Sequence, residues 1–374
     1  MALLLNGRFL TRPPTGVDRV AVELMRAFLA RDDAPELRCV VPQPGPIQEL
    51  GTFPDAPIKS VEISDSILKG QLWEQVSLPG LAAEETLLSL CNIGPIASAN
   101  QVVMMHDAQA FTQPQAYARA FRMWYHAVQP RLGRTAKLVL TVSRFSAGEL
   151  EAHGVVPRGK ARVVHNGADH ILRTAADPEI LTDFALEPQG YFLAIGSLAP
   201  HKNLKMLIAA AERRGAGAPP LVIAGGGNAR VFGENGLRES ASVRLLGRVS
   251  DAQLRALYEN ALALTFPSLT EGFGLPPVEA MMCGCPVIAA PRGAVPEICG
   301  SAARYADPED VQAWTVAMQD IANNPQERQE RAEAGRAQSA AFTWQAAAAQ
   351  FAAHLDEAGL LFSAQGHRLR SVPR

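Results

Sequence analysis

The segment 261–290 restricts the fold of this chain more than any other part of it. It opens with an apolar run of strand length, 261–266, and closes with a second apolar run, 286–290. Between the two runs, Pro276 suits the first turn of a helix, where N–H groups have no partner within the helix, and Gly284 suits the helix end. This order predicts a strand, a loop, a short helix and a second strand.

The loop of this segment combines an adaptable backbone with two carboxylates. Gly272 and Gly274 let the backbone approach a ligand closely, and the free N–H groups at the helix start favour an anion such as phosphate. Glu271 and Glu279 would repel that anion unless they bind something else, such as the vicinal hydroxyls of a ribose or a hexose. We therefore expect a sugar-phosphate or sugar-nucleotide site. The alternative is an ordinary turn with two solvated glutamates, which the intervening Gly-Phe-Gly-Leu-Pro-Pro disfavours.

Bulk properties exclude several classes of protein. With 374 residues the chain is long enough for two domains with complete cores. Its 48% hydrophobic and 19% charged residues are typical of a globular protein, and a net charge of -2 gives no support for a nucleic-acid partner. The cysteines lie mostly in apolar contexts that fit reduced thiols, and the first residues resemble a strand more than a signal peptide. We expect a cytoplasmic protein.

Strand-like and helix-like segments alternate in two series, separated by a polar, proline-containing stretch between Asp169 and Gly190. Such alternation predicts an α/β fold with two doubly wound, Rossmann-like domains, 1–175 and 176–344, that face each other across a cleft. Besides the two runs above, the predicted strands are 2–9, 37–41, 59–63, 87–92, 101–105, 137–142, 162–165, 191–197, 221–224 and 243–246. The predicted helices are 17–30, 117–132, 143–153, 203–214, 252–260, 310–323, 326–339 and 345–358.

Polar side chains follow several of these strands, at the edge where parallel sheets bind ligands. Lys202 follows the strand 191–197, so its ammonium group could neutralise a diphosphate, and the adjacent Asn203 is a good helix N-cap. His106 ends the run 101–105 and could hydrogen-bond a sugar hydroxyl or a developing positive centre. The alternatives without a ligand are that Lys202 is a solvated loop lysine and that His106 makes only structural hydrogen bonds within the protein.

Motifs for phosphate and metal are sparse. Gly16, just before a helix, would let backbone N–H groups meet a phosphate, but neither this turn nor the three glycines starting at Gly225 have the spacing of a dinucleotide motif. The chain contains no Asp-x-Asp, so a metal-chelated diphosphate is disfavoured, and we expect no metal and no other cofactor. Lys202, helix N-termini and loop amides would then meet the charge of a leaving diphosphate.

The predicted helix 117–132 mixes arginines with aromatic residues. It could lie on an anionic membrane or hold a lipid-linked acceptor, or it could more simply pack its aromatic rings inward and solvate its arginines. The basic tail from His367 to Arg374 leaves the same choice between a membrane contact and a frayed end.

Together these motifs resemble GT-B retaining glycosyltransferases of family 4, the glycosyl transferases group 1 type. In the C-terminal half the resemblance rests on Pro200-His-Lys202-Asn203, Leu246-Gly-Arg-Val249, Glu271-Gly-Phe-Gly-Leu with Glu279, and Gly284-Cys-Pro-Val. In the N-terminal half it rests on the sparser Thr15-Gly16, His106-Asp107 and Asn166-Gly167.

The resemblance implies roles for these residues. Glu279 would hold the ribose, Glu271 would face the donor sugar, and Lys202 would stabilise the diphosphate close to Gly16. His106 would approach the donor sugar from the N-terminal domain. Domain 1–175 would bind the acceptor and domain 176–344 the nucleotide-sugar donor, and the last helix, in 345–374, would rejoin the N-terminal domain. Four further donor-binding positions would act through the amides of the glycine loop: Gly272, Phe273, Gly274 and Leu275. Val249 would lie near the base, and Arg248 and Ser197 complete the donor-binding set.

The resemblance also implies an activity. The protein would be a retaining, metal-independent transferase that moves a hexose from a nucleotide diphosphate sugar to a saccharide or lipid-linked saccharide acceptor in surface polysaccharide synthesis. GDP-mannose is favoured as the donor, because the sequences Pro-His-Lys-Asn at Lys202 and His-Asp at His106 resemble those of the mannosyltransferase branch. Peripheral contact with the cytoplasmic face of the membrane is a further expectation.

One departure from the family pattern leaves alternatives open. Many members carry an arginine directly after the strand glycine, where this chain has Ser197, and Arg248 or Arg19 could replace the missing charge. This departure favours one alternative, a non-catalytic scaffold that binds sugar nucleotides. A nucleotide-sugar epimerase or hydrolase on the same fold is a second alternative.

Overall fold

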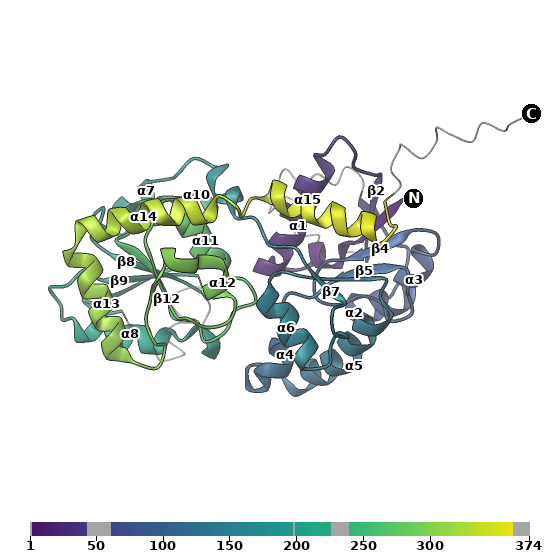
Figure 1. The fold of residues 1–374 in the computed structure, drawn as a ribbon, viewed down its shortest axis with the longest axis horizontal. Helices are drawn as coiled ribbons and strands as arrows, with labels where there is room; N and C mark the ends of the chain where they lie inside the picture. Colours follow the sequence, from purple (N-terminus) through teal and green to yellow (C-terminus); the bar gives the residue numbers. More distant parts are fainter. Residues whose placement is uncertain (1, 43–60, 197–198, 226–238, 362–374) are drawn as a thin grey trace, which may run out of the picture. The chain divides into compact units, whose positions relative to one another are not determined.

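The computed structural model describes residues 2–42, 61–196, 199–225 and 239–361 (Figure 1). The chain divides into two compact units. Unit 1 contains residues 1–166 together with the segment that begins at Trp344, and unit 2 contains residues 167–343. Unit 2 is thus continuous in sequence, whereas unit 1 is assembled from both ends of the chain.

Unit 1 is built on a seven-stranded parallel sheet with the strand order β3-β2-β1-β4-β5-β6-β7. Its strands are β1 Leu3–Asn6, β2 Leu37–Val41, β3 Val61–Ile63, β4 Thr86–Ser89, β5 Gln101–Met104, β6 Leu138–Thr141 and β7 Ala161–Val163. Its helices are α1 Gly16–Leu29, α2 Gly70–Leu72, α3 Leu78–Leu81, α4 Gln109–Thr112, α5 Arg119–Thr135, α6 Arg144–Ala152 and α15 Trp344–Glu357. The central strands are buried along their whole length, as strands covered on both faces must be.

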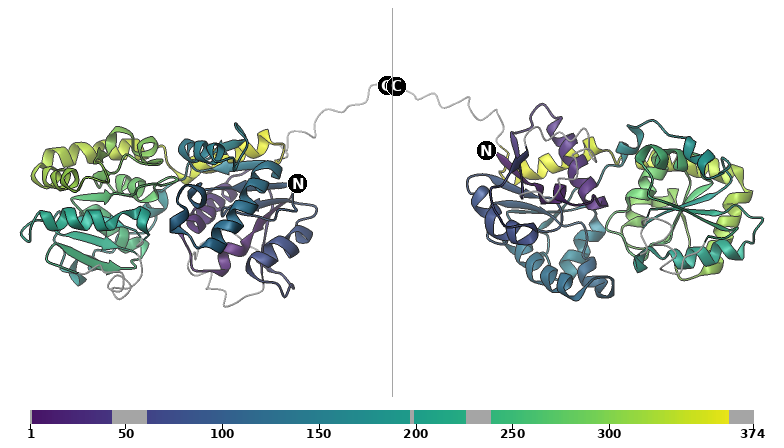
Figure 2. Two further views of the ribbon diagram at one scale, coloured as in Figure 1. Left: turned by 90° about the horizontal axis from the view of Figure 1, so that it is seen from below. Right: turned by 180° about the vertical axis from the view of Figure 1, so that it is seen from behind.

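Helix α15 lies beside α1 within unit 1 (Figures 1 and 2). The rings of Phe28 and Phe351 meet edge to face, with their centroids 5.0 Å apart. Gln350 Oε1 accepts the N–H of His165 at 3.0 Å. An aromatic pair of this kind contributes about 0.5–1.5 kcal/mol of stability beyond that from burying its apolar surface. These contacts make α15 a structural part of unit 1.

Unit 2 is built on a six-stranded parallel sheet with the order β10-β9-β8-β11-β12-β13. Its strands are β8 Phe192–Ile195, β9 Leu221–Ala224, β10 Val243–Gly247, β11 Ala263–Phe266, β12 Val287–Ala289 and β13 Arg304–Tyr305. Its helices are α7 Glu179–Asp183, α8 Leu204–Arg213, α10 Asp251–Asn260, α11 Leu275–Met282, α12 Val295–Cys299, α13 Val311–Asn323 and α14 Pro325–Ser339.

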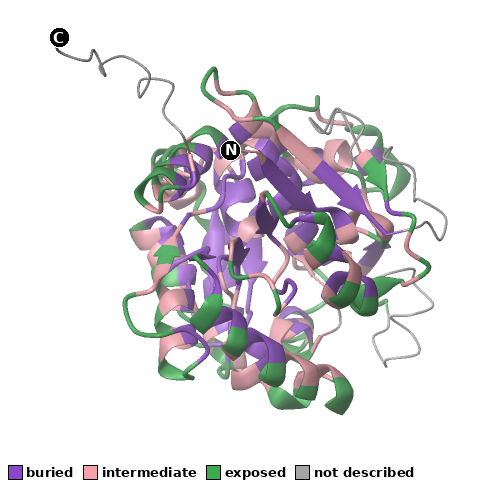
Figure 3. Cartoon of the chain, turned by 90° about the vertical axis from the view of Figure 1, so that its right-hand side faces the viewer, coloured by how far each residue is buried: buried purple, intermediate pink, exposed green. Residues whose placement is uncertain are grey.

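Two hydrophobic clusters hold the helices of unit 2 to its sheet. One joins α8 and α13 to the strands through residues such as Leu207 and Trp314, and the other joins α10 and α11 through residues such as Leu257 and Ala280. Figure 3 shows the same principle in the sheet facing the viewer, where the central strands are coloured as buried, while edge strands and the helices carry intermediate and exposed colours. No helix in the described part of the chain is long and apolar enough to cross a membrane.

The predicted α/β architecture with two doubly wound parallel sheets is confirmed. Differences are local. The first strand ends at Asn6, not Phe9, because a 3-10 helix follows at Gly7–Thr11 and Asn6 Oδ1 accepts the N–H of Arg8 at its start. The short helices between residues 70 and 81, and α12, were not predicted.

Candidate functional site

In unit 2 several predicted site residues gather at the carboxyl ends of β8 and β11. These strands are neighbours, and the strand order reverses between them. An open parallel sheet binds ligands at such a point, because the loops after the two strands lead to opposite sides and leave a crevice. Lys202 lies in the loop after β8, and Glu271 lies in the loop after β11.

Lys202 and Glu271 form an ion pair. Lys202 Nζ lies 2.6 Å from Glu271 Oε1, and the two side chains are 20% and 12% exposed. The ring of Phe266, the last residue of β11, lies 5.7 Å from the ammonium group, within range of a cation–π interaction. The structure therefore brings together the two residues that the sequence analysis assigned to the diphosphate and to the donor sugar.

Further hydrogen bonds tie the same two loops together. Leu269 donates its N–H to the carbonyl of His201 at 2.7 Å, and Asn203 Nδ2 donates to the carbonyls of Pro267 and Pro308 at 3.4 and 2.8 Å. Asn203 stands at the N-cap position of α8, but its side chain does not cap the helix as the sequence suggested. Its φ of 55° departs from the extended backbone that side-chain capping needs.

His201, next to Lys202 in the loop after β8, has a buried ring nitrogen. Burial, followed by the charge of Lys202, lowers the pKa of His201, so its imidazole is neutral at pH 7. Its Nδ1 is buried and has no hydrogen-bond partner among the residues that the structure describes.

A glycine that the sequence analysis overlooked holds the loop that carries Glu271. Gly293 has a φ of 62°, and a Cβ on it would lie 2.6 Å from the Glu271 nitrogen and 2.7 Å from its carbonyl oxygen. The adjacent Ala294 donates its N–H to that carbonyl at 3.0 Å. Only glycine fits here, and the available signal was its place in Pro291-Arg-Gly293, directly after a predicted strand.

The glycine loop ends at the start of α11. Gly274 is the N-cap residue, with a φ of 95°, and no side chain of the described residues caps this helix. Leu275 is the first helical residue. The Phe273 ring is buried against Phe342, with centroids 5.7 Å apart, so a ligand could not reach its face. Donor contacts of Gly272 and Phe273 through the backbone stay a prediction.

Glu279 lies on α11 and is only 6% exposed. The hydroxyl of Tyr258 donates to its Oε2 at 3.0 Å, and His170 Nε2 lies 3.1 Å from its Oε1. Burial, with the carboxylate second, raises the pKa of Tyr258 well above its usual value, so this hydroxyl keeps its proton. A carboxylate has about four acceptor positions, of which these two contacts use one on each oxygen, and the ribose role of Glu279 stays a prediction. The sequence analysis identified neither partner of Glu279.

The remaining donor-binding positions of unit 2 are less informative. Ser197 lies outside the described residues. Arg248 is exposed and Val249 packs partly against the core, both in the loop after β10, two strands away from β8. In the described part of the chain, Arg248 forms no ion pair with Glu271. Compensation by Arg248 for the missing family arginine stays a prediction.

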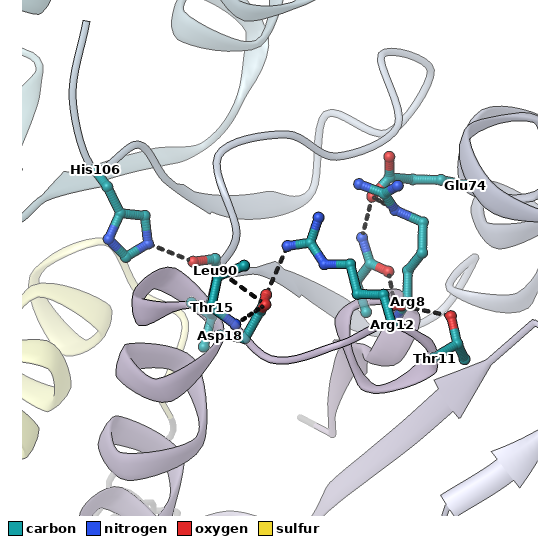
Figure 4. Close-up of polar contacts among 9 residues, drawn as sticks. Arg8, Thr11, Arg12, Thr15, Asp18, Glu74, Leu90 and His106 are labelled. Atoms are coloured by element: carbon teal, nitrogen blue, oxygen red, sulfur yellow. Dashed lines mark hydrogen bonds and ion pairs between the residues drawn. The ribbon is translucent and has the colours of Figure 1, made fainter. Parts of the chain in front are cut away.

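In unit 1 the helix α1 begins at Gly16, and a Cβ on Gly16 would meet no atom within 4 Å. The helix start already holds the buried carboxylate of Asp18 (Figure 4). Asp18 Oδ2 accepts the N–H and the hydroxyl of Thr15, both at 2.8 Å, and Oδ1 accepts from Arg12 Nη2 at 2.6 Å. A negative charge therefore lies beside the predicted phosphate contact of Gly16, which stays a prediction.

His106 follows β5 and is 5% exposed. Its Nε2 lies 2.8 Å from the carbonyl oxygen of Leu90 (Figure 4), and its backbone N–H donates to Asn92 Oδ1 at 2.7 Å. Burial lowers the pKa of His106, so the ring is neutral and donates its Nε2–H to Leu90. Only Nδ1 could then accept a hydrogen bond from a sugar hydroxyl, and that role stays a prediction.

Comparisons with known proteins add to this geometry. The family description "Glycosyl transferases group 1" matches residues 179–338, and "Glycosyltransferase Family 4" matches residues 87–171. O-antigen chain mannosyltransferase B of Escherichia coli is 34% identical over 258 residues, which cover 65% of this chain and 67% of that protein. O-antigen chain mannosyltransferase RfbU of Salmonella typhimurium is 28% identical over 231 residues, covering 60% of this chain and 62% of that protein.

Solved structures share the fold. HepE from Anabaena, in complex with UDP and glucose, superposes with a TM-score of 0.72 at 19% identity, over 96% of this chain and 100% of that chain. Sucrose-phosphate synthase from Thermosynechococcus elongatus gives a TM-score of 0.71 at 18% identity, over 95% and 98% of the two chains.

Two doubly wound parallel sheets, shared with the solved glycosyltransferase structures, define the GT-B class of sugar transferases. Similarity to the relatives identifies the family: the chain belongs to the family 4 glycosyltransferases and is a hexosyltransferase.

Proposed function

We propose that the protein transfers mannose from GDP-mannose to a saccharide or lipid-linked saccharide acceptor in surface polysaccharide synthesis, with retention at the anomeric carbon and without a metal ion. The ion pair of Lys202 and Glu271 carries the proposal, because it places a fixed cation at the point of the sheet where a diphosphate would bind. Support for the sugar comes from the relatives named as O-antigen mannosyltransferases. Support for a nucleotide donor comes from the neighbour solved with UDP and glucose.

Donor binding would change the partner of Lys202. Its ammonium group leaves Glu271 for the diphosphate, where it joins the N–H groups of Gly274 and Leu275 at the start of α11; the next two helical residues, Pro276 and Pro277, have no N–H to donate. Glu271 is then available to hydroxyls of the hexose, and Glu279 uses its remaining acceptor positions for the ribose.

The transfer itself breaks the bond between the anomeric carbon and the diphosphate oxygen. The acceptor oxygen bonds to the same carbon from the same face, and its proton passes to the departing phosphate. Negative charge grows on the diphosphate as this bond breaks, so Lys202 stabilises the transition state more than the bound donor.

Donor binding and transfer can be tested separately on the purified full chain. A thermal-shift screen of nucleotide sugars should single out GDP-mannose, because a ligand at 100 times its Kd adds about 2.7 kcal/mol to stability. Mannosyl transfer should then continue in excess EDTA and give an α-linked product by NMR. Stabilisation by another nucleotide sugar alone would refute the choice of donor, and release of free mannose without any acceptor product would favour a hydrolase. Donor binding without turnover on any acceptor would favour a scaffold.

Contact with the membrane surface is a separate part of the proposal. Helix α5 carries four arginines and no acidic residue, and Met123 on it is 72% exposed. Such a face suits anionic lipid. Co-sedimentation with vesicles of anionic phospholipid, and its absence with neutral vesicles, is the expected result; equal recovery with both kinds of vesicle would contradict it. The basic tail from His367 lies outside the described residues.

A further inference from the structure

The buried carboxylate of Glu279 has a hydrogen-bond donor on each of its oxygens. Tyr258 on α10 donates its hydroxyl to Oε2 at 3.0 Å, and His170 Nε2 lies 3.1 Å from Oε1. The side chains of His170 and Glu279 are only 2% and 8% exposed, so both are nearly out of water. Two lone pairs this close would repel each other, so His170 Nε2 carries a hydrogen and donates it to the carboxylate.

Donors on both oxygens fix the plane of the carboxylate. The last torsion of a glutamate side chain is soft, so a carboxylate with a single partner can rotate about it. With Tyr258 on one oxygen and His170 on the other, that rotation stops, and the further acceptor positions of each oxygen have a fixed direction. The two neighbouring hydroxyls of a ribose can each donate to one of these oxygens. Such a diol binds more tightly to a carboxylate that is already oriented, because no rotation has to be frozen on binding.

The backbone that carries His170 is also held in place. His170 belongs to the 3-10 helix Asp169–Leu172. Arg255 Nη1 on α10 donates to the carbonyls of Leu172 and Thr174, both at 2.9 Å, and so ties this short helix to α10. Because α10 also carries the tyrosine that donates to the other oxygen of the carboxylate, one helix aligns both donors.

His170 lies close to the point where the chain enters unit 2. The unit begins at Gly167, and the N–H of Ala168 donates to the carbonyl of Phe342, near the end of the unit, at 2.9 Å. The ring of Phe342 also packs edge to face against Phe273 in the glycine loop. Both ends of unit 2 therefore contact the expected donor site, the last one through the Phe342 ring and the first one through His170.

We propose that His170 is a positioning residue for the nucleotide donor, which holds the Glu279 carboxylate in the orientation that both ribose hydroxyls need. This inference rests on the proposed function, because it takes the donor to be a nucleotide whose ribose meets Glu279. The competing explanation is a histidine that only joins the 3-10 helix to α11. That role would affect the stability of unit 2 and the binding of every nucleotide alike, whereas a positioning role depends on the ribose hydroxyls.

Matched pairs of nucleotides separate the two explanations in calorimetry on the full chain. The probes are GDP, UDP and ADP, each beside its 2′,3′-dideoxy form, which lacks both ribose hydroxyls. For the parent protein, at least one diphosphate should bind about tenfold more tightly than its dideoxy form, since the dideoxy form cannot donate to the carboxylate. His170→Phe keeps a ring and removes both nitrogens. The preference for the ribose hydroxyls should fall to about twofold in this variant, with the affinity for the dideoxy form unchanged.

Further variants control for packing and folding. His170→Gln should restore the preference, because the amide Nε2 of glutamine can donate from a position close to that of the histidine Nε2. His354→Phe is the matched control: His354 Nε2 lies 3.1 Å from the Val163 carbonyl in unit 1, and its loss should leave the preference at the parent value. If His170→Phe does not fold, His170→Leu, with its smaller side chain, provides the same test. A folded His170→Phe or His170→Leu protein that keeps the parent preference would refute the positioning role, even if it binds both forms more weakly.

The same measurements distinguish this proposal from the proposed function. If UDP or ADP binds in place of GDP and its preference depends on His170, the choice of GDP-mannose is wrong and the positioning role stands. If GDP binds and its preference does not depend on His170, only the positioning role fails. A parent protein that binds a nucleotide without preference for the ribose hydroxyls would overturn the ribose contact of Glu279 and this proposal with it. Absence of binding by all three diphosphates would refute the nucleotide donor as well.

Discussion

The strand reversals of the two units have the same topology, and each holds a cation paired with a carboxylate, but the helix starts beside them differ. In unit 2, Lys202 points its charge at the reversal, and α11 begins without a side-chain cap among the described residues. In unit 1, α1 begins at the reversal with Asp18 inside its first turn, and the nearby Arg12 is paired with that carboxylate. Both helices present the positive end of a helix dipole. The fold therefore sets the place of each site, while Asp18 puts a carboxylate into the first turn of α1 that has no counterpart in the first turn of α11.

The largest effect is expected when unit 2 loses its cation. Lys202→Ala should lower turnover about 10²–10³-fold, because about 2.7–4 kcal/mol of transition-state stabilisation is lost with one such contact. The measurement is initial rate at saturating donor. Lys205→Ala, an exposed lysine on α8, is the matched control and should keep full turnover. Full turnover in Lys202→Ala would contradict the claim that Lys202 stabilises the departing diphosphate in unit 2.

The next effect is expected when unit 1 loses its carboxylate. Asp18→Asn should lower the free energy of unfolding by about 2–3 kcal/mol, since a buried set of hydrogen bonds is lost, although partial exposure of Arg12 limits the charge contribution. It should also create weak binding of inorganic phosphate, detectable by calorimetry. Asp33→Asn, at an exposed pair with Arg31, is the control. A folded Asp18→Asn protein that does not bind phosphate would contradict the claim that Asp18 excludes anions from the start of α1.

A smaller effect is expected at the ribose position. Tyr258→Phe removes one donor from Glu279 and should weaken nucleotide-sugar binding by about 1.5 kcal/mol while leaving the rate at saturation nearly unchanged. Tyr191→Phe is the control. The buried hydroxyl of Tyr191 donates at 2.8 Å to the carbonyl of Leu257, which lies on α10 like Tyr258, but it does not contact Glu279. Equal loss of donor affinity in both variants would mean that Tyr258 acts through stability alone.

The smallest effect concerns pH. Burial lowers the pKa of His106, so the unfolded chain binds its proton more readily than the folded chain. The stability due to the neutral ring is present above the ordinary histidine pKa of about 6.5 and is lost as pH falls through the folded value, by at most about 1.4 kcal/mol per pH unit. His106→Gln should flatten the fall in melting temperature below pH 6.5, whereas the exposed His153→Gln should not. Equal slopes in both variants would contradict a buried neutral His106.

Much of the fold and part of the site could be predicted, because they depend on local pattern. The apolar runs, Pro276 at a helix start and Gly284 after a helix end are short-range features, and the structure has a helix from Leu275 to Met282 between two strands as expected. Lys202 and Glu271 could each be placed after a strand. Their direct pairing could not, since it depends on which strands are neighbours.

What the sequence analysis missed is mostly long-range. His170 meets Glu279 from a distant part of the chain, and nothing in its local sequence points to a carboxylate. Asn203 is a residue type that often caps helices, but its backbone is left-handed and its side chain donates instead to the carbonyls of Pro267 and Pro308, far along the chain. Asp18 is different: Thr15-x-x-Asp18 is a recognisable capping box, so the negative charge at α1 could have been predicted.

The assembly of unit 1 from both chain ends has a consequence for synthesis. The face of α1 that carries Phe28 is completed only by α15, and all of unit 2, residues 167–343, is translated in between. At ordinary rates of translation this interval lasts roughly 10–35 s. The unit made first is therefore finished last, and until then it exposes an apolar helix face that a chaperone could bind. A nascent chain stalled before Trp344 should accordingly be more sensitive to protease in unit 1 than the released protein.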